Sequence, residues 1–141
     1  MNNKEKTLII IKPDITKQKK TGDIISILEK TNLSIIAMKM IKPSKNELIE
    51  FYKEHENKVF FEELIEFMTS GPIIAIVLNG NNIIQTTRKI IGNTNYELAE
   101  KGTIRNIFAT SITKNAIHGS DSLKSADREI NIFFKKNEFI E

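Results

Sequence analysis

An uninterrupted apolar run limits the possible folds of this chain more than any other feature. Residues 73–78 are all apolar, with Gly71-Pro72 before them and Asn79-Gly80 after them. The run is too short to cross a bilayer, which takes about 20 apolar residues. A strand with one solvent-exposed face alternates apolar and polar residues, but this run does not. We therefore predict a strand that is buried on both faces and lies in the centre of a sheet.

Three more segments are predicted to be extended. Residues 7–11 form a short run rich in β-branched residues that ends at Lys12-Pro13-Asp14, where we expect a loop because proline lacks a hydrogen-bond donor. Residues 33–41 end before Pro43, and residues 116–119 form a brief extended piece.

Segments of helical period separate these strands. Ser44 and Glu47 match a capping box, and Ser120, Asp121 or Ser122 could cap the last helix. The predicted helices cover residues 22–31, 44–52, 61–68, 83–91 and 123–133. This order, without a glycine-rich first turn, predicts an α/β (α+β) fold: a ferredoxin-like sandwich with a four-stranded antiparallel sheet covered by helices.

Residues 92–114 show no clean period. A connection of 23 residues is long for a structureless segment in a compact domain, so we expect this region to be functional or buried in an interface.

Length and composition exclude several classes of protein. With 141 residues and 16.1 kDa, the chain fits a single domain over residues 1–141. It contains no cysteine and only two histidines, which excludes disulfides, cysteine nucleophiles and ordinary zinc sites. The first six residues lack the apolar region of a signal peptide, so we expect a cytoplasmic protein without a membrane segment.

The basic residues are almost all lysine. The chain has 18 lysines and three arginines, and we interpret this excess as genome composition. The net charge of +3 is therefore weak support for a nucleic-acid partner. Arg88 and Arg105 bracket the long irregular segment, where a planar fork can bind two phosphate oxygens. For Arg128, next to Glu129, we expect a surface ion pair.

His118 is the best candidate for a reactive group, because a neutral imidazole is nucleophilic near pH 7. It lies between a predicted strand and a predicted helix, whose first amides (residues 120–123) we expect to form an anion site. Either Glu129 or Ser120 could fix the orientation and tautomer of its ring. We expect His55 to be a solvated or packing residue.

The chain has no glycine-rich phosphate loop, so side chains must hold any phosphate. Phe60 and Phe61 lie at the start of a predicted helix. One could lie in the core, which we favour for Phe61, and the other could stack on a base. Glu62, Glu63 and Glu66 fit a solvated helix face better than a metal cage.

One long motif resembles a known family. Residues 115–122 read N-A-I-H-G-S-D-S, which is similar to the N-x-x-H-G-S-D-S signature of nucleoside diphosphate kinases. Further similar stretches follow in the family's order: I-K-P-D at residues 11–14, F-Y-x-x-H at 51–55, F-F at 60–61, F-M-T-S-G-P at 67–72, G-x-T-N at 92–95 and G-T-I-R at 102–105. The chain therefore resembles this family over essentially its whole length.

The resemblance implies an enzyme that transfers the γ-phosphate of ATP or another nucleoside triphosphate to a nucleoside diphosphate by a ping-pong mechanism. His118 would be the phosphorylated nucleophile, oriented by Ser120 and Glu129. The phosphates would be held by five residues: Lys12, Tyr52, Arg88, Thr94 and Arg105. Asn115 and Lys12 would contact the ribose, Phe60 would stack on the base, and Leu64 and Ile112 would lie near it.

The resemblance also implies partners. Mg²⁺ would be carried by the nucleotide phosphates rather than by a protein metal site, and the chain would form a tetramer or hexamer built from dimers. Tyr96, Asn106 and Ile107 depart from the family's loop pattern, which affects the expected rigidity and assembly. The sequence disfavours two other functions. A basic nucleic-acid-binding module is disfavoured because residues 7–11 and 73–78 contain no stacking aromatics, and an inactive relative is disfavoured by the intact motif.

Overall fold

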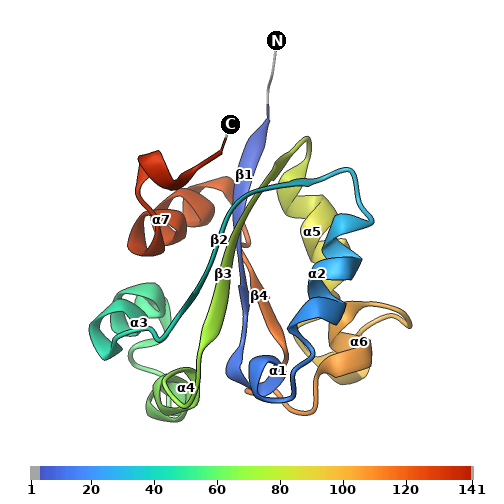
Figure 1. Cartoon of the computed structure of the whole chain (residues 1–141). Coiled ribbons are helices and arrows are strands. Elements are labelled where there is room, and N and C mark those ends of the chain that lie inside the picture. The colour runs from blue at the N-terminus through green and yellow to red at the C-terminus, as the bar shows by residue number, and fades with distance from the viewer. Residues whose placement is uncertain (1–3, 141) are drawn as a thin grey trace.

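The computed structural model describes residues 4–140 and has four antiparallel strands in one sheet (Figure 1). The strands are β1 (Glu5–Ile11), β2 (Ser34–Ile41), β3 (Ile73–Gly80) and β4 (Ile117–Gly119). Their order across the sheet is β2-β3-β1-β4. The predicted ferredoxin-like α/β sandwich with a four-stranded antiparallel sheet is confirmed.

Strand β3 lies inside the sheet, as its apolar run predicts. It pairs with β1 from Glu5 opposite Gly80 to Ile11 opposite Ile74, and with β2 on its other side. Successive side chains of a strand point to opposite faces, so alternate residues of β3 enter two separate apolar clusters.

Helices cover both faces of the sheet (Figure 1). On one side lie α3 (Lys45–Phe51), α4 (Phe61–Met68) and α7 (Leu123–Phe133), and on the other lie α2 (Thr21–Glu29), α5 (Ile83–Ile91) and α6 (Ile104–Phe108). The short α1 (Pro13–Lys17) follows β1, and three 3₁₀ turns cover Lys53–His55, Tyr96–Leu98 and Lys136–Glu138.

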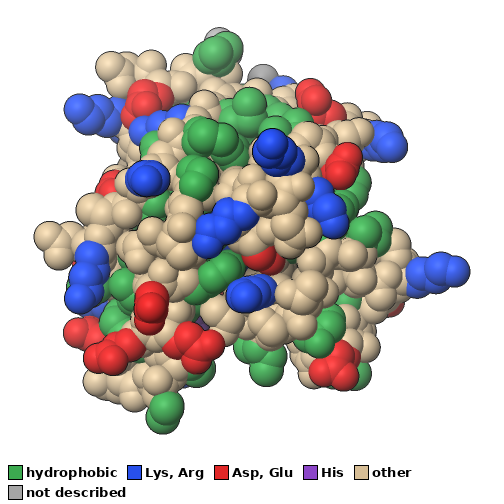
Figure 2. Space-filling model, turned by 60° about the horizontal axis from the view of Figure 1, so that its bottom comes forward, with side chains coloured by type: hydrophobic (Ala, Val, Ile, Leu, Met, Phe, Trp, Pro, Cys, Tyr) green, Lys and Arg blue, Asp and Glu red, His purple; other side chains and the backbone are tan. Residues whose placement is uncertain are grey.

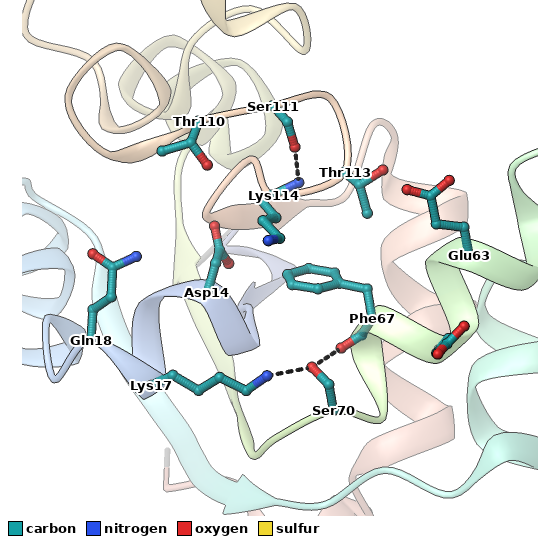
Figure 3. Close-up of a pocket in the computed structure, with 11 residues that line it drawn as sticks. Asp14, Lys17, Gln18, Glu63, Phe67, Ser70, Thr110, Ser111, Thr113 and Lys114 are labelled. Atoms are coloured by element: carbon teal, nitrogen blue, oxygen red, sulfur yellow. Dashed lines mark hydrogen bonds between the residues drawn. The ribbon is translucent and has the colours of Figure 1, made fainter.

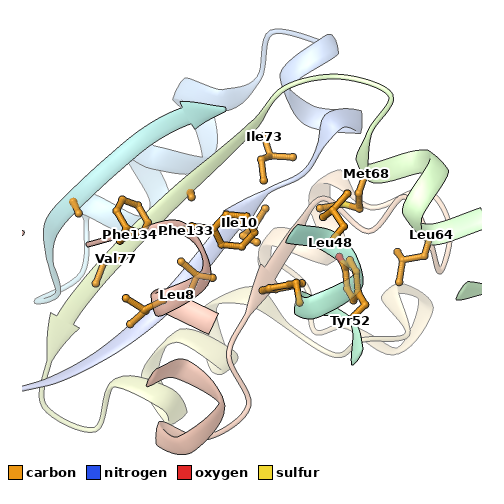
Figure 4. Packing of buried hydrophobic residues seen from close by; sticks show 14 of the residues in the cluster. Leu8, Ile10, Leu48, Tyr52, Leu64, Met68, Ile73, Val77, Phe133 and Phe134 are labelled. Carbon is orange, nitrogen blue, oxygen red and sulfur yellow. The ribbon is translucent and has the colours of Figure 1, made fainter. Parts of the chain in front are cut away.

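The cluster beneath α3, α4 and α7 supports the face of the sheet on which His118 lies. Leu8 and Ile10 of β1 pack there against Leu48 and Tyr52, with Phe133 from the end of α7 (Figure 4). Burial of such side chains contributes about 1.5–3 kcal/mol each. This packing fixes the positions of α3 and α7 relative to β1 and β4.

The structure differs from the sequence predictions in two places. Pro13 does not sit in a loop but begins α1, because the first position of a helix needs no N–H donor. The region 92–114 contains a 3₁₀ turn and α6, whose N-cap Thr103 accepts a hydrogen bond from the amide of Asn106. A helix of five residues is too short to show a period in the sequence.

The predicted caps are confirmed. The Ser44 hydroxyl accepts from the Glu47 amide while the Glu47 carboxylate accepts from the Ser44 amide, at 3.0 and 2.8 Å. Ser122 caps α7 by accepting from the amide of Ser125 at 3.0 Å. Within residues 4–140, no helix is both long and apolar enough to cross a membrane.

Candidate active site

The pleat of β4 directs His118 toward α3 and α7. Its neighbours Ile117 and Gly119 face the opposite side, where a Cβ on Gly119 would lie 2.5 Å from Cδ1 of Ile91. His118 therefore points toward Phe51, and the two rings meet edge to face with centroids 4.8 Å apart. The glycine allows α5 to pack closely on the sheet, behind the histidine.

Glu129 and Ser120 form a connected set with His118. Oε1 of Glu129 lies 2.8 Å from Nε2 of His118 and accepts a hydrogen bond from the Ser120 hydroxyl at 2.7 Å. Glu129 thus contacts the ring directly, whereas Ser120 orients the carboxylate. The expectation that the amides of residues 120–123 form an anion site is wrong for Ser120. Its N–H already donates to the carbonyl of Leu8 at 3.2 Å, so it is not available to an anion.

This arrangement assigns the tautomer of the neutral ring. A carboxylate only accepts hydrogen bonds, so Nε2 of His118 carries the hydrogen and Nδ1 keeps its lone pair. The side chain of His118 is 20% exposed, so the ring is within reach of a ligand.

Lys12 and Asn115 come together at the end of β1. Nζ of Lys12 donates to Oδ1 of Asn115 at 2.8 Å. Burial and the nearby charge of Arg105 lower the pKa of Lys12 to about 8, although the carboxylate of Asp14 acts in the opposite direction. A buried cation beside a second cation provides a strong site for phosphate oxygens.

Arg105 links the irregular segment to β4. Its guanidinium donates to the carbonyls of Ile117 and Gly92 at 2.9 and 3.2 Å and to Oγ1 of Thr94 at 3.4 Å. Burial, together with the charge of Arg88, lowers the pKa of Arg105 to about 10, so it stays charged at neutral pH. Arg88 itself is exposed in the last turn of α5.

Tyr52 is buried at the end of α3, and its hydroxyl has no hydrogen-bond partner among residues 4–140. Burial and the charge of Glu129 raise the pKa of this hydroxyl well above its ordinary value. An orphaned hydroxyl close to Glu129 is available to donate to a bound anion. The ring of His55 lies between those of Tyr52 and Phe60, with centroid distances of 6.2 and 6.0 Å. This position fits the packing role expected from the sequence.

The residues expected around the base differ in exposure. Phe60 and Ile112 are 46% and 75% exposed, while Leu64 is buried in the core together with Tyr52. Leu64 therefore supports this region from beneath rather than facing solvent. Phe61 packs against the core, as expected.

The acidic residues of α4 form a solvated face. Glu62, Glu63 and Glu66 are exposed, as the sequence predicts. Among the residues that the structure describes, no three histidine, aspartate or glutamate side chains come together to hold a metal ion.

A hollow of about 640 Å³ lies between α1, α4 and the loop 110–114, next to Glu63 and Glu66 (Figure 3). Lys17 donates to the hydroxyl of Ser70 at its rim at 2.7 Å, and Phe67 and Lys114 line it. None of the predicted site residues lines this hollow.

Comparison with known proteins decides the family. The family model described as nucleoside diphosphate kinase matches residues 5–139. The chain belongs to the nucleoside diphosphate kinase family.

Individual relatives agree over nearly the full length. A nucleoside diphosphate kinase of Wigglesworthia glossinidia brevipalpis is 54% identical over 133 residues, covering 94% of each chain. One of Methanocaldococcus jannaschii is 48% identical, covering 98% of this chain and 99% of the relative. The family is nucleotide-dependent, and this chain is a phosphotransferase that transfers the γ-phosphate of a nucleoside triphosphate to a nucleoside diphosphate.

Solved structures agree as well. The nucleoside diphosphate kinase of Aquifex aeolicus, in an orthorhombic crystal form, has a TM-score of 0.93 at 42% identity, covering 97% of this chain and 99% of that one. The Halobacterium salinarum enzyme in complex with CDP has a TM-score of 0.95 at 35% identity, covering 99% and 93%.

Membership of the kinase family supports the enzyme over the nucleic-acid-binding alternative. The surface charge agrees, because Lys and Arg side chains on the face shown in Figure 2 are interspersed with Asp and Glu. A single basic stripe, which nucleic-acid binding favours, is not seen on that face.

Three contacts near the site were not predicted from the sequence motifs. The rings of Phe51 and His118 pack edge to face, and Asp14 accepts a hydrogen bond from the amide of Ala116 at 3.0 Å. Gly92 supplies a carbonyl to Arg105 and has a φ of +94°. The sequence signals were present, because Phe51, Asp14 and Gly92 all lie inside matched motifs, but a motif does not say which atoms meet.

The expected ion pair of Arg128 with Glu129 is wrong. The guanidinium of Arg128 donates to the carbonyls of Glu50 and Phe51 at 2.9 and 3.3 Å. It therefore caps the last turn of α3, where helical carbonyls lack partners. Glu129 turns instead to His118.

Proposed function

We propose that His118 carries the phosphoryl group between a nucleoside triphosphate and a nucleoside diphosphate, in two steps at one site. The observation that carries this proposal is the contact of Nε2 with the Glu129 carboxylate at 2.8 Å. It keeps the hydrogen on Nε2 and leaves the lone pair on Nδ1, so Nδ1 is the nucleophilic atom.

In the first step, Nδ1 of His118 attacks the γ-phosphorus in line. The N–P bond forms, the bond to the β-phosphate oxygen breaks, and the nucleoside diphosphate leaves with that electron pair. The ring then carries a positive charge, which the Glu129 carboxylate stabilises through Nε2–H. In the second step, a terminal oxygen of another nucleoside diphosphate attacks the phosphorus and restores the neutral ring.

The cations of the site stabilise the charge that spreads over the transferred group. Lys12, Arg88 and Arg105 supply positive charge from three different elements, and electrostatic preorganisation of this kind is usually the largest catalytic term. The orphaned hydroxyl of Tyr52 and the hydroxyl of Thr94 donate further hydrogen bonds to the phosphates.

The rest of the nucleotide lies along the exposed side of the site. Asn115 and Lys12 contact the ribose, and the exposed ring of Phe60 stacks on the base, with exposed Ile112 beside the base and buried Leu64 supporting this region from beneath. Stacking uses a face that every base presents, so we expect weak discrimination between bases.

Mg²⁺ fits this site only as an ion carried by the nucleotide. The residues that we propose to hold the phosphates include the cations Lys12, Arg88 and Arg105, and these suit phosphate oxygens rather than a metal. Phosphate oxygens are the ligands that Mg²⁺ takes in such sites, and the ion withdraws charge from the phosphates when bound.

We also propose a homo-oligomer, a tetramer or hexamer built from dimers, in the cytoplasm. Strand β2 lies at the edge of the sheet with Met38 and Met40 exposed, and Leu98 and Ile107 are exposed on the segment 92–114. Edge strands and exposed apolar residues are common at interfaces. A chain without cysteine suits a reducing compartment. Measurement of mass in solution tests the assembly.

Incubation with γ-labelled ATP and Mg²⁺ tests the mechanism. The wild type acquires phosphate that is labile in acid and stable in base, and His118→Ala acquires none. His55→Gln is the matched control, because it alters the only other histidine and leaves the nucleophile in place. Labelling of His118→Ala at the wild-type level would exclude His118 as the carrier.

A further inference from the structure

A strained turn immediately precedes β4, the strand that carries His118. Ala116 has a φ of +76°, a region that residues with a Cβ rarely adopt. The amide of Ile117 donates to the carbonyl of Asn115 at 2.9 Å, which closes a three-residue turn around Ala116. Turns of this kind with positive φ are rare and persist only where neighbouring structure holds them in place.

The segment 12–14 holds this turn from both sides. Oδ2 of Asp14 accepts a hydrogen bond from the amide of Ala116 at 3.0 Å, and the amide of Lys12 donates to the carbonyl of Ala116 at 3.0 Å. Figure 3 shows the Asp14 side chain pointing from α1 toward the loop that carries Thr110 and Lys114. Asp14 and Ala116 are both buried.

The turn sets the spacing of the groups on either side of it. Before it, Asn115 binds Nζ of Lys12. After it, the carbonyl of Ile117 accepts from Arg105, and His118 follows. A relaxed turn would move Asn115 and His118 relative to each other, and with them the cations that each segment holds.

We propose that Asp14 is a positioning residue for phosphoryl transfer, because its carboxylate fixes the turn at Ala116 and thereby places His118 relative to Lys12 and Arg105. This inference rests on the proposed role of His118. The carboxylate has two separable effects, since its hydrogen bond holds the turn and its negative charge raises the pKa of Lys12. Burial raises the pKa of Asp14 itself.

Two substitutions separate these effects. Asp14→Asn keeps an acceptor for the Ala116 amide and removes the charge, whereas Asp14→Ala removes both. We expect Asp14→Asn to keep kcat within about 3-fold and to move the alkaline limb of the pH–rate profile to lower pH. We expect Asp14→Ala to lower kcat by about 10- to 100-fold with a smaller change in KM, as for a small misplacement of reacting groups. The matched control is Asp23→Ala on the exposed surface of α2.

A third substitution tests the link to strain. Glycine adopts a φ of +76° without penalty, so Ala116→Gly in the Asp14→Ala background recovers part of the lost kcat. Asp14→Ala with wild-type kcat and an intact thermal transition would overturn the proposal. A kcat of Asp14→Asn that is lowered about 10- to 100-fold, as expected for Asp14→Ala, would also overturn the proposal. This second test holds even if Asp14→Ala does not fold. Failure of the proposed function is distinct, because His118→Ala would then still be labelled.

Discussion

Nε2 of His118 lies 2.8 Å from Oε1 of Glu129, and in our proposal this contact orients the partly buried imidazole as the nucleophile. The carboxylate comes from α7 and the ring from β4, so the contact depends on how α7 packs against β1 and β4. It fixes the tautomer of the neutral ring, and it would stabilise the positive charge that the proposed phosphorylation places on that ring.

Substitution of Glu129 tests the charge of this contact. Glu129→Gln keeps an acceptor of the same shape but loses the negative charge, so we expect the rate of single-turnover phosphorylation to fall about 10-fold. Glu129→Ala removes the acceptor as well, so we expect the phosphorylation rate to fall further. Rapid-quench measurement with labelled ATP checks both, and equal rates in wild type and Glu129→Ala would contradict the assignment.

The two arginines of the site have different structural environments. Arg105→Lys cannot make the three hydrogen bonds of the buried guanidinium, so we expect the free energy of unfolding to fall by about 2 kcal/mol and activity to fall as well. Arg88→Lys, at an exposed position, keeps stability within about 0.5 kcal/mol but lowers kcat about 10-fold. Urea unfolding and steady-state kinetics separate the two cases. Unchanged phosphotransfer in either variant would refute a need for the planar fork.

The lowered pKa of Lys12 predicts a pH-dependent stability difference. The folded protein binds the Lys12 proton less tightly than the unfolded chain, with a pKa of about 8 against 10.5, so wild-type stability from this group rises between those pH values. Lys12→Met removes the buried charge, and we expect it to be inactive but more stable at pH 7 by about 1–2 kcal/mol. Denaturation of both proteins at pH 7 and pH 10 checks this, because the difference in free energy of unfolding between Lys12→Met and the wild type becomes smaller at high pH. An advantage that stays constant would contradict the shift.

Arg128 should act through the end of α3. Arg128→Ala leaves the carbonyls of Glu50 and Phe51 without their donor, so we expect a loss of about 1 kcal/mol and faster amide exchange in the last turn of α3. Arg128→Lys, which can reach one carbonyl, is intermediate, and Lys124→Ala on the exposed face of α7 is the control. Unchanged exchange in Arg128→Ala would show that the cap is unimportant.

Much of the fold was predictable because the signals are local. The apolar run at residues 73–78 identified an internal strand, and the capping box at Ser44 marked a helix start correctly. Of the three candidate caps for the last helix, Ser120, Asp121 and Ser122, the structure uses Ser122. The two missed helices, α1 and α6, have five residues each, so neither contains enough turns for a period to appear.

The sequence by itself determined which residues are available for the proposed chemistry, since the motif around His118 contains the candidate nucleophile and its neighbours. Only the tertiary structure decided which atoms meet. The Lys12–Asn115 and Asp14–Ala116 hydrogen bonds join residues 103 and 102 positions apart, and both exist because β1 pairs with β4 in one register. Local propensity acts over a few residues, whereas these contacts depend on strand register and helix packing, which bring distant segments together through burial of the apolar core.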